Sequence, residues 1–117
     1  MTISAMRMRE PTYFILAALQ DGPLHGYAII RRAEELSQGR VKLATGTLYA
    51  ALDRLTGEQL IQVVDDQVVN GRARRYYELT VAGLQALRTE ADRMLAAARI
   101  VTERARFRSA QPKAVQA

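Results

Sequence analysis

The sequence predicts an α+β fold in which three short helices are followed by a β-hairpin and then by one long helix. Three observations predict this order. Apolar residues recur at helical spacing in three segments that end before residue 58. The period then shortens to that of two strands between residues 60 and 79. From residue 81 onward, apolar residues return every three or four positions without a break, which is typical of one long helix.

Length and composition indicate one globular domain. The chain has 117 residues, of which 49% are hydrophobic and 25% charged, the balance of a chain that folds. It has no cysteine, which excludes disulfides, thiolate catalysis and Cys-ligated zinc. The longest apolar run, Tyr13 to Leu19, is too short to cross a bilayer, and the N-terminus lacks a signal-peptide pattern. We therefore expect a soluble, cytoplasmic protein.

The first half of the chain predicts three helices. The first follows Pro11 and covers 12–20, and Asp21-Gly22-Pro23 ends it. The second covers 24–36, with an apolar stripe formed by Tyr27, Ile30, Ala33 and Leu36. The third has Thr45 as its expected N-cap and ends near Gly57. Its apolar stripe consists of Leu48, Ala51, Leu52 and Leu55.

The second half predicts a hairpin and a long helix. Strands are expected at 60–64 and 75–79, with a turn at Asn70-Gly71. The long helix begins at Val81. The order is that of a winged helix-turn-helix domain over 8–80 with an added C-terminal dimerisation helix over 81–108 and a disordered tail over 109–117. In such a domain the third helix enters the DNA major groove, and the hairpin, or wing, reaches the adjacent backbone or minor groove.

The outward face of the third helix is the first candidate DNA-binding surface. Helical geometry places this face opposite the Leu48 stripe. Gly46 and Ala50 would allow close approach, and the polar side chains would contact phosphates or bases. An ordinary solvated face is the alternative, and Asp53 favours it because a carboxylate beside phosphate is unfavourable. The candidate contacts from this helix are Thr45, Gly46, Thr47, Tyr49 and Arg54.

The wing is the second candidate surface. The stretch NGRARR places Arg72, Arg74 and Arg75 within a few residues and without a nearby acid, in a chain of net charge +5. Guanidinium groups there can hold phosphate or enter a narrow minor groove. The alternative is a charged hairpin edge that prevents strand pairing between molecules. We expect nucleic acid to be the partner.

No catalytic or metal site is expected. His25 is the chain's one histidine, and it has neither a cysteine nor a second ligand at a metal-binding spacing. We expect it to begin a helix. Phosphate-binding glycine loops and nucleophile motifs are also missing from the sequence. The chain is therefore predicted not to be an enzyme and to need no cofactor.

The long helix outruns a three-helix domain, so a second subunit is expected to cover it and form a two-fold dimer. The alternative is that its apolar seam packs on its own domain. The expected interface residues are Leu84, Leu87, Ala91, Met94, Ala98 and Val101.

The chain resembles the PadR family of bacterial transcriptional regulators, in its short class with one C-terminal helix. Four pieces in order carry the resemblance: Gly22-Pro23-Leu24-His25-Gly26-Tyr27-Ala28-Ile29, Thr45-Gly46-Thr47-Leu48-Tyr49-Ala50-Ala51-Leu52, Gly71-Arg72-Ala73-Arg74-Arg75-Tyr76-Tyr77 and Leu79-Thr80-Val81-Ala82-Gly83. It implies a homodimeric repressor on a palindromic operator, released in many members by a small aromatic or drug-like effector. It also implies that Tyr49 is the recognition-helix tyrosine.

Two positions depart from the family pattern. Ala50 stands where proline is common and restores a backbone donor. Gln59 stands where glycine is common before the first strand, so we expect the helix C-cap to move to Gly57.

The leading hypothesis is a dimeric, ligand-responsive DNA-binding repressor that contacts half-sites ~10 bp apart. The first alternative is a winged-helix interaction module whose basic wing binds an acidic protein. A second is a protein that sequesters small molecules without regulating a gene. The aromatic residues available to an effector are Tyr13, Phe14 and Phe107.

Overall fold

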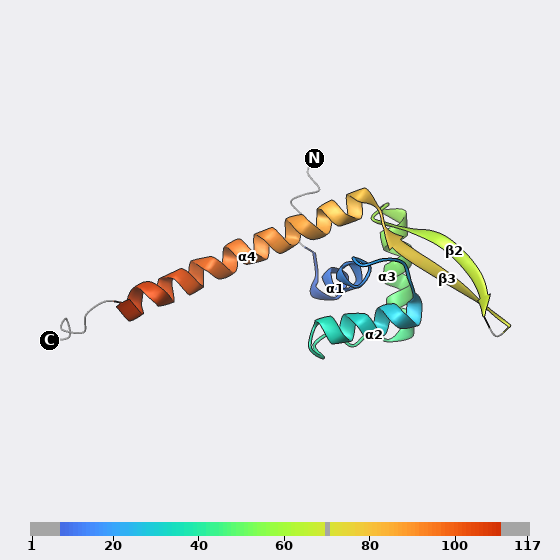
Figure 1. The fold of residues 1–117 in the computed structure, drawn as a ribbon, viewed down its shortest axis with the longest axis horizontal. Helices are drawn as coiled ribbons and strands as arrows, with labels where there is room; N and C mark the ends of the chain where they lie inside the picture. Colours follow the sequence, from blue (N-terminus) through green and yellow to red (C-terminus); the bar gives the residue numbers. More distant parts are fainter. Residues whose placement is uncertain (1–7, 70, 111–117) are drawn as a thin grey trace.

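The computed structural model describes residues 8–69 and 71–110, and Figure 1 shows their arrangement. The order of elements confirms the predicted fold class. The long helix ends at Ala110, two residues beyond the expected boundary, and the rest of the expected tail lies outside the described residues. The elements are α1 (Glu10–Ala18), β1 (Leu24–His25), α2 (Gly26–Leu36), α3 (Thr45–Gly57), β2 (Ile61–Val69), β3 (Arg72–Leu79) and α4 (Val81–Ala110).

The strands form one antiparallel sheet in the order β1-β3-β2. The prediction of a helix from Leu24 was wrong at its first two residues. Leu24 pairs with Tyr77 and His25 pairs with Tyr76, because the outer edge of β3 offers unpaired backbone groups to this segment. The helix then begins at Gly26. His25 precedes it as the N-cap, and its Nδ1 accepts a hydrogen bond from the Ala28 N–H at 3.4 Å, as expected for a helix-start residue.

The core lies where the three helices meet the base of the sheet. The predicted stripe of α3 is confirmed, since Leu48, Leu52 and Leu55 are fully buried. In α2 the buried face is shifted by about one residue, because Ile29 is buried while Tyr27 is 64% exposed. The core cluster consists of Ile15, Leu16, Ala18, Leu19, Ile29, Leu48, Leu52, Leu55, Ile61, Tyr77 and Leu87. The helices, the wing base and the start of α4 therefore form one unit.

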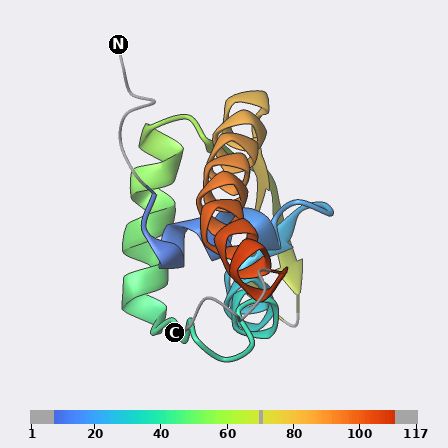
Figure 2. The ribbon, with the colours of Figure 1, turned by 90° about the vertical axis from the view of Figure 1, so that its left-hand side faces the viewer.

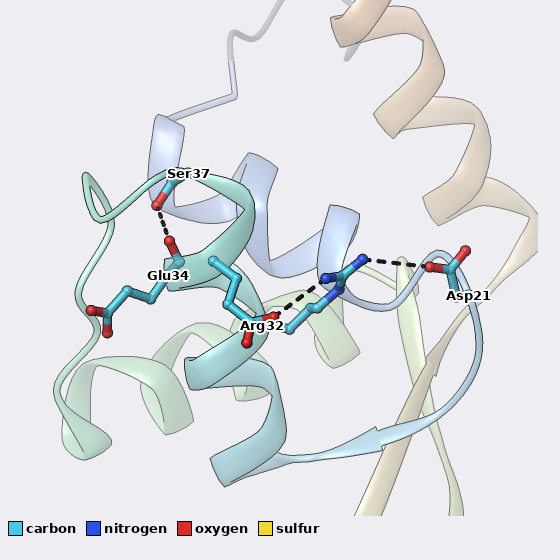
Figure 3. Close-up of polar contacts among 5 residues, drawn as sticks. Asp21, Arg32, Glu34 and Ser37 are labelled. Atoms are coloured by element: carbon cyan, nitrogen blue, oxygen red, sulfur yellow. Dashed lines mark hydrogen bonds and ion pairs between the residues drawn. The ribbon is translucent and has the colours of Figure 1, made fainter.

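Ser37 fixes the turn that leads from α2 to α3. Its hydroxyl donates to the Glu34 carbonyl at 3.2 Å (Figure 3). It also accepts from the Val41 N–H at 2.9 Å. On the same helix, Arg32 pairs with Asp21 at 3.8 Å and with Glu35 at 3.3 Å. The buried serine thus links the last turn of α2 to the segment that leads to α3.

The start of α3 differs from the prediction by one residue. Ala44 is the N-cap and provides no side-chain hydrogen bond, so Thr45 is the first helical residue. The expected N-cap role of Thr45 was therefore wrong. The reason is that the backbone becomes extended at Ala44 instead of at Thr45. Thr45 is exposed at the N-terminal end of α3.

Gln59 ends α3 in the left-handed conformation, with φ of 62°. The Leu60 N–H donates to the Leu55 carbonyl at 3.0 Å, as in a helix end closed by a left-handed residue. The expected move of the C-cap to Gly57 was therefore wrong, because Gly57 is helical and Gln59 itself adopts the conformation that glycine favours. The geometry is retained at the cost of about 1–2 kcal/mol of backbone strain.

We expect Gln59→Gly to raise the free energy of unfolding by about 0.5–1 kcal/mol, because the relief of strain exceeds the entropy that glycine loses on folding. Thermal denaturation followed by circular dichroism measures it. Glu58→Gly is the matched control. Glu58 has right-handed geometry and lies 3.5 Å from Arg54, so glycine there should lower stability. Equal melting temperatures of Gln59→Gly and the wild type would show that Gln59 is not strained.

Helix α4 is anchored at its start and uncovered beyond it. The Thr80 hydroxyl donates to the Gln59 carbonyl at 2.7 Å and accepts from the Gly83 N–H at 2.9 Å. Every residue from Asp92 to Arg108 is exposed. Figures 1 and 2 show this part projecting away from α1, α2 and α3. In the part of the chain described, no helix has the length and apolar character needed to cross a membrane.

Candidate nucleic-acid interface

The outward face of α3 is exposed, as predicted. Thr45, Gly46, Thr47 and Ala50 all lie on the surface, and a Cβ added to Gly46 would meet no atom within 4 Å. The open side of the helix therefore combines hydroxyl groups with positions that have little or no side chain. Such a surface allows another molecule to approach the helix backbone closely.

Tyr49 joins this face to the beginning of α2. A Cβ added to Gly26 would overlap the Tyr49 hydroxyl and lie 2.9 Å from its Cζ. The phenol therefore rests on the backbone of Gly26 while 44% of Tyr49 remains exposed. The sequence pattern around Gly26 did not predict this contact. A glycine at the first position of an amphipathic helix is the signal that pointed to a close approach.

The two faces of β3 carry different arginines because side chains alternate along a strand. Tyr77 faces the core, and Arg75, two residues earlier, shares that face and donates a hydrogen bond to the Tyr77 hydroxyl. Burial raises the pKa of Tyr77, the nearby Arg75 opposes the rise, and Tyr49 and Asp53 add to it. Arg75 therefore lies beside α3, where the wing and the outward face of that helix meet.

The opposite face of β3 brings Arg74 to His25. Arg74 Nη1 lies 3.4 Å from His25 Nε2, and the rings of His25 and Tyr76 meet edge to face at 5.5 Å. Desolvation, followed by the charge of Arg74, lowers the pKa of His25. Sequence reasoning missed this cluster because it placed His25 in a helix and not on a strand beside the wing.

The end of the wing is formed by a tight turn. Gly71 has φ of 77°, which glycine adopts without strain, and Arg72 pairs with Val69 across the strands. Arg72 therefore begins β3, three residues before the expected strand at 75–79. Asn70 and the Arg72 side chain lie outside what the structure describes.

Arg54 is not grouped with the other candidate contacts. Its Nη2 donates to the Thr12 hydroxyl at 2.9 Å, and its Nη1 lies 3.5 Å from Glu58. Arg40, in the loop before α3, pairs with Glu10 at 2.8 Å. Both arginines thus tie the helix-turn-helix to α1, while Lys42 stays exposed.

The expected interface residues of α4 divide into two groups. Leu87 is 3% exposed and belongs to the core of its own chain, and Leu84 and Ala91 are half-buried. Met94, Ala98 and Val101 are exposed. The first part of the seam therefore packs on its own domain, as the alternative held, and the second part has no cover among the described residues.

The three aromatic candidates for an effector do not gather in one place. Tyr13 and Phe14 meet edge to face at 5.1 Å on α1, with Tyr13 packed against the core, whereas Phe107 is 61% exposed far along α4. Among residues 8–69 and 71–110, no three His, Cys, Asp or Glu side chains lie close enough to hold a metal ion.

Comparison with known proteins gives a family match and related sequences. Residues 15–89 match the model of the Transcriptional regulator PadR-like family. A transcriptional regulator of Mycobacterium tuberculosis, Rv3488, is 42% identical over 81 residues, which cover 69% of this chain and 71% of that protein. An uncharacterized 37.1 kDa protein in transposon TN4556 of Streptomyces fradiae is 43% identical over 89 residues. That match covers 76% of this chain and spans about a quarter of the Streptomyces protein, 24%.

Solved structures show the same fold. A PadR family regulator from Clostridium difficile is similar with a TM-score of 0.68 and 23% identity, over 81% of this chain and 97% of that one. Bacillus subtilis PadR, solved in complex with operator DNA, is similar with a TM-score of 0.62 and 28% identity. The latter match covers 71% of this chain and 46% of the Bacillus chain.

Proposed function

Because the chain belongs to the PadR-like family of transcriptional regulators, we propose that it binds double-stranded operator DNA through α3 and the wing and acts as a dimeric repressor. The observation that carries the proposal is the proximity of the two candidate surfaces: Arg75 of the wing donates a hydrogen bond to the Tyr77 hydroxyl, and Tyr49 and Asp53 of α3 are near enough to raise the pKa of Tyr77. One continuous surface thus contains a helix suited to a groove and a basic strand suited to phosphate. The operator complex of the Bacillus relative supports the same partner.

Each surface has a distinct task in this proposal. Thr45 and Thr47 offer hydroxyl groups to phosphate and base edges, and Gly46 lets the helix approach them. The wing arginines neutralise phosphates, which supplies affinity for any duplex. Tyr49 keeps its position through Gly26, so its exposed edge meets the groove at a fixed angle. Sequence preference therefore comes from α3 and most of the salt dependence from the wing.

A second copy of the chain is the proposed cover for α4. The seventeen consecutive exposed positions, 92–108, lack the tertiary packing that supplies most of the stability of helices in proteins. Their seam of Met94, Ala98 and Val101 suits helix-helix packing. A two-fold dimer would place two α3 helices on a palindrome with half-sites ~10 bp apart.

Release by a small effector, and action in the cytoplasm on operator DNA, are proposed from the family resemblance. An aromatic or drug-like molecule bound where α4 meets a partner would change the spacing of the two DNA-binding surfaces. Such a change would weaken binding to a palindrome, because both half-sites must be reached at once.

Substitutions on α3 and on the wing test the proposal. The wild-type protein would select a duplex from a random-sequence library, and fluorescence anisotropy would measure its affinity at 50–200 mM salt beside a scrambled duplex. We expect Thr47→Ala and Tyr49→Ala each to weaken the selected duplex by about 5- to 100-fold, with little effect on the scrambled one. The triple change Arg72→Ala, Arg74→Ala, Arg75→Ala should weaken both duplexes and flatten the salt response.

The same measurements separate DNA from an acidic protein partner. Six to ten phosphate contacts would make the wild-type affinity fall about 10³- to 10⁵-fold over that salt range. Failure to select any duplex, or a flat salt response, would reject DNA as the partner. Loss of binding only in the wing variant, with both α3 variants unchanged, would favour recognition by charge alone and so the interaction-module alternative.

A further inference from the structure

His25 has a proton arrangement that its place in the fold dictates. Its Nδ1 accepts a hydrogen bond from the Ala28 N–H at 3.4 Å, which caps α2. A neutral imidazole that accepts at Nδ1 carries its proton at Nε2. The lowered pKa of His25 favours this neutral form. His25 therefore presents an N–H donor at Nε2.

Arg74 directs a second donor to the same point. Its Nη1 lies 3.4 Å from His25 Nε2, and in the tautomer that caps α2 this distance brings a guanidinium N–H and an imidazole N–H together. Two donors cannot satisfy one another. Within the described ranges, no carboxylate pairs with Arg74, and its side chain is exposed. The pair therefore lacks a shared acceptor, and an anionic oxygen would supply it.

The fold holds the two donors together. His25 pairs with Tyr76 across β1 and β3, and Arg74, two residues before Tyr76, shares that face of the sheet. The rings of Tyr76 and His25 are inclined at 88°, and this contact restrains the plane of the imidazole. The short strand β1 thus connects the first turn of α2 to the wing at this position.

We infer that His25 and Arg74 together bind one phosphate of the DNA backbone, so that the start of α2 and the wing contact the same DNA strand. The inference rests on the proposed function. It adds a DNA contact from His25, at the start of α2, to those proposed for α3 and the wing. Phosphate is the acceptor because a neutral donor beside a guanidinium matches two oxygens of one tetrahedral group.

Two substitutions of His25 separate binding from capping. Asparagine retains an acceptor at the position of Nδ1 and is a good N-cap, but it has no donor at the position of Nε2. Glutamine can place an N–H near Nε2 but loses the cap. If His25 binds phosphate, His25→Asn should weaken the selected duplex about three- to tenfold at unchanged melting temperature, and His25→Gln should melt lower yet bind more tightly than His25→Asn.

Arg74 gives the second arm of the test. Arg74→Gln should weaken binding about tenfold and reduce the salt slope by about one per subunit bound, whereas His25→Asn removes a neutral group and should leave the slope unchanged. Because both residues hold one phosphate, the double variant should lose less than the product of the two single losses. Arg88→Gln, at an exposed position on α4, is the control for general charge.

A spectroscopic readout addresses the contact directly. His25 is the chain's one histidine, so its imidazole nitrogen signals need no assignment by mutation. On adding the selected duplex, the Nε2 proton should become protected from exchange, and the pKa of His25 should rise beside the phosphate. The charged and titratable groups that face the ring are Arg74 and Tyr76 of β3, while the first turn of α2 from Gly26 to Ile29 carries no charge.

The outcomes distinguish this inference from the proposed function. Tight, selective binding by wild type together with binding of His25→Asn within twofold, or an unchanged imidazole signal in the complex, would overturn the phosphate pair and leave DNA recognition standing. A wild-type protein that selects no duplex would overturn both.

Discussion

Gly83→Ala is expected to lower the melting temperature by about 10–20 °C, the largest effect on stability predicted for a single substitution in this chain. Gly83 is buried in the first turn of α4, and a Cβ there would overlap the Leu60 carbonyl oxygen and lie 2.9 Å from the carbonyl carbon. The obstacle is backbone and cannot turn aside as a side chain can. To make room, α4 must move away from the segment that joins α3 to the wing.

That movement would also break the hydrogen bonds that hold the segment. The Thr80 N–H donates to the Leu60 carbonyl at 3.1 Å, and the Thr80 hydroxyl donates to the Gln59 carbonyl at 2.7 Å. Overpacking costs about 1–3 kcal/mol, and each lost hydrogen bond about 1 kcal/mol. Thermal and urea unfolding followed by circular dichroism would measure the total.

Gly57→Ala is the matched control for Gly83→Ala. Gly57 is also helical, but it is exposed and a Cβ added there meets nothing within 4 Å. Alanine at this position should leave stability unchanged or raise it slightly, because it favours helix more than glycine does. Similar melting of the two variants would show that the Leu60 contact relaxes at little cost.

The sequence predicted those parts of the fold that repeat. The stripe of Leu48, Leu52 and Leu55 is periodic, and the three residues are buried as the helical spacing required. Strand β1 has only two residues and therefore no period, so its pairing with β3 could not be seen. Gln59 was misread for a related reason: glycine statistics pointed to Gly57, whereas the packing of Thr80 on Gln59 and Leu60 decides where the chain turns.

The sequence predicted those parts of the candidate site that depend only on which residues are exposed. The outward face of α3 follows from helical geometry, whatever surrounds it. The partners of individual polar groups depend on contacts between residues far apart in the sequence. Arg54 reaches Thr12 across 42 positions, and Arg74 reaches His25 across 49, so no local pattern could assign them. For the same reason, the division of the wing arginines between two faces required the register of β3.

Met94→Glu combined with Val101→Glu is expected to separate the proposed dimer and lower operator affinity by at least about 100-fold. Both residues are exposed in the single chain, one heptad apart on the part of α4 without cover, so the folded domain should tolerate the change. In a dimer, each carboxylate would be taken out of water in an apolar seam without a partner, which is strongly unfavourable. Two linked DNA-binding surfaces bind a palindrome with an affinity about 10²- to 10⁴-fold higher than one surface does, and the monomer loses this increase.

Analytical ultracentrifugation and anisotropy on the selected duplex would check this prediction. Sedimentation should give a molecular mass of twice 13.1 kDa for the wild type and of 13.1 kDa for the variant. Ala96→Glu places the same charge at an exposed position on the opposite side of α4 and should affect neither mass nor affinity. A variant that remains dimeric and binds like wild type would move the interface away from this seam. Because the core around Leu87 lies within one chain, a cooperative melting transition of the variant would show that lost DNA binding reflects lost association and not unfolding of the domain.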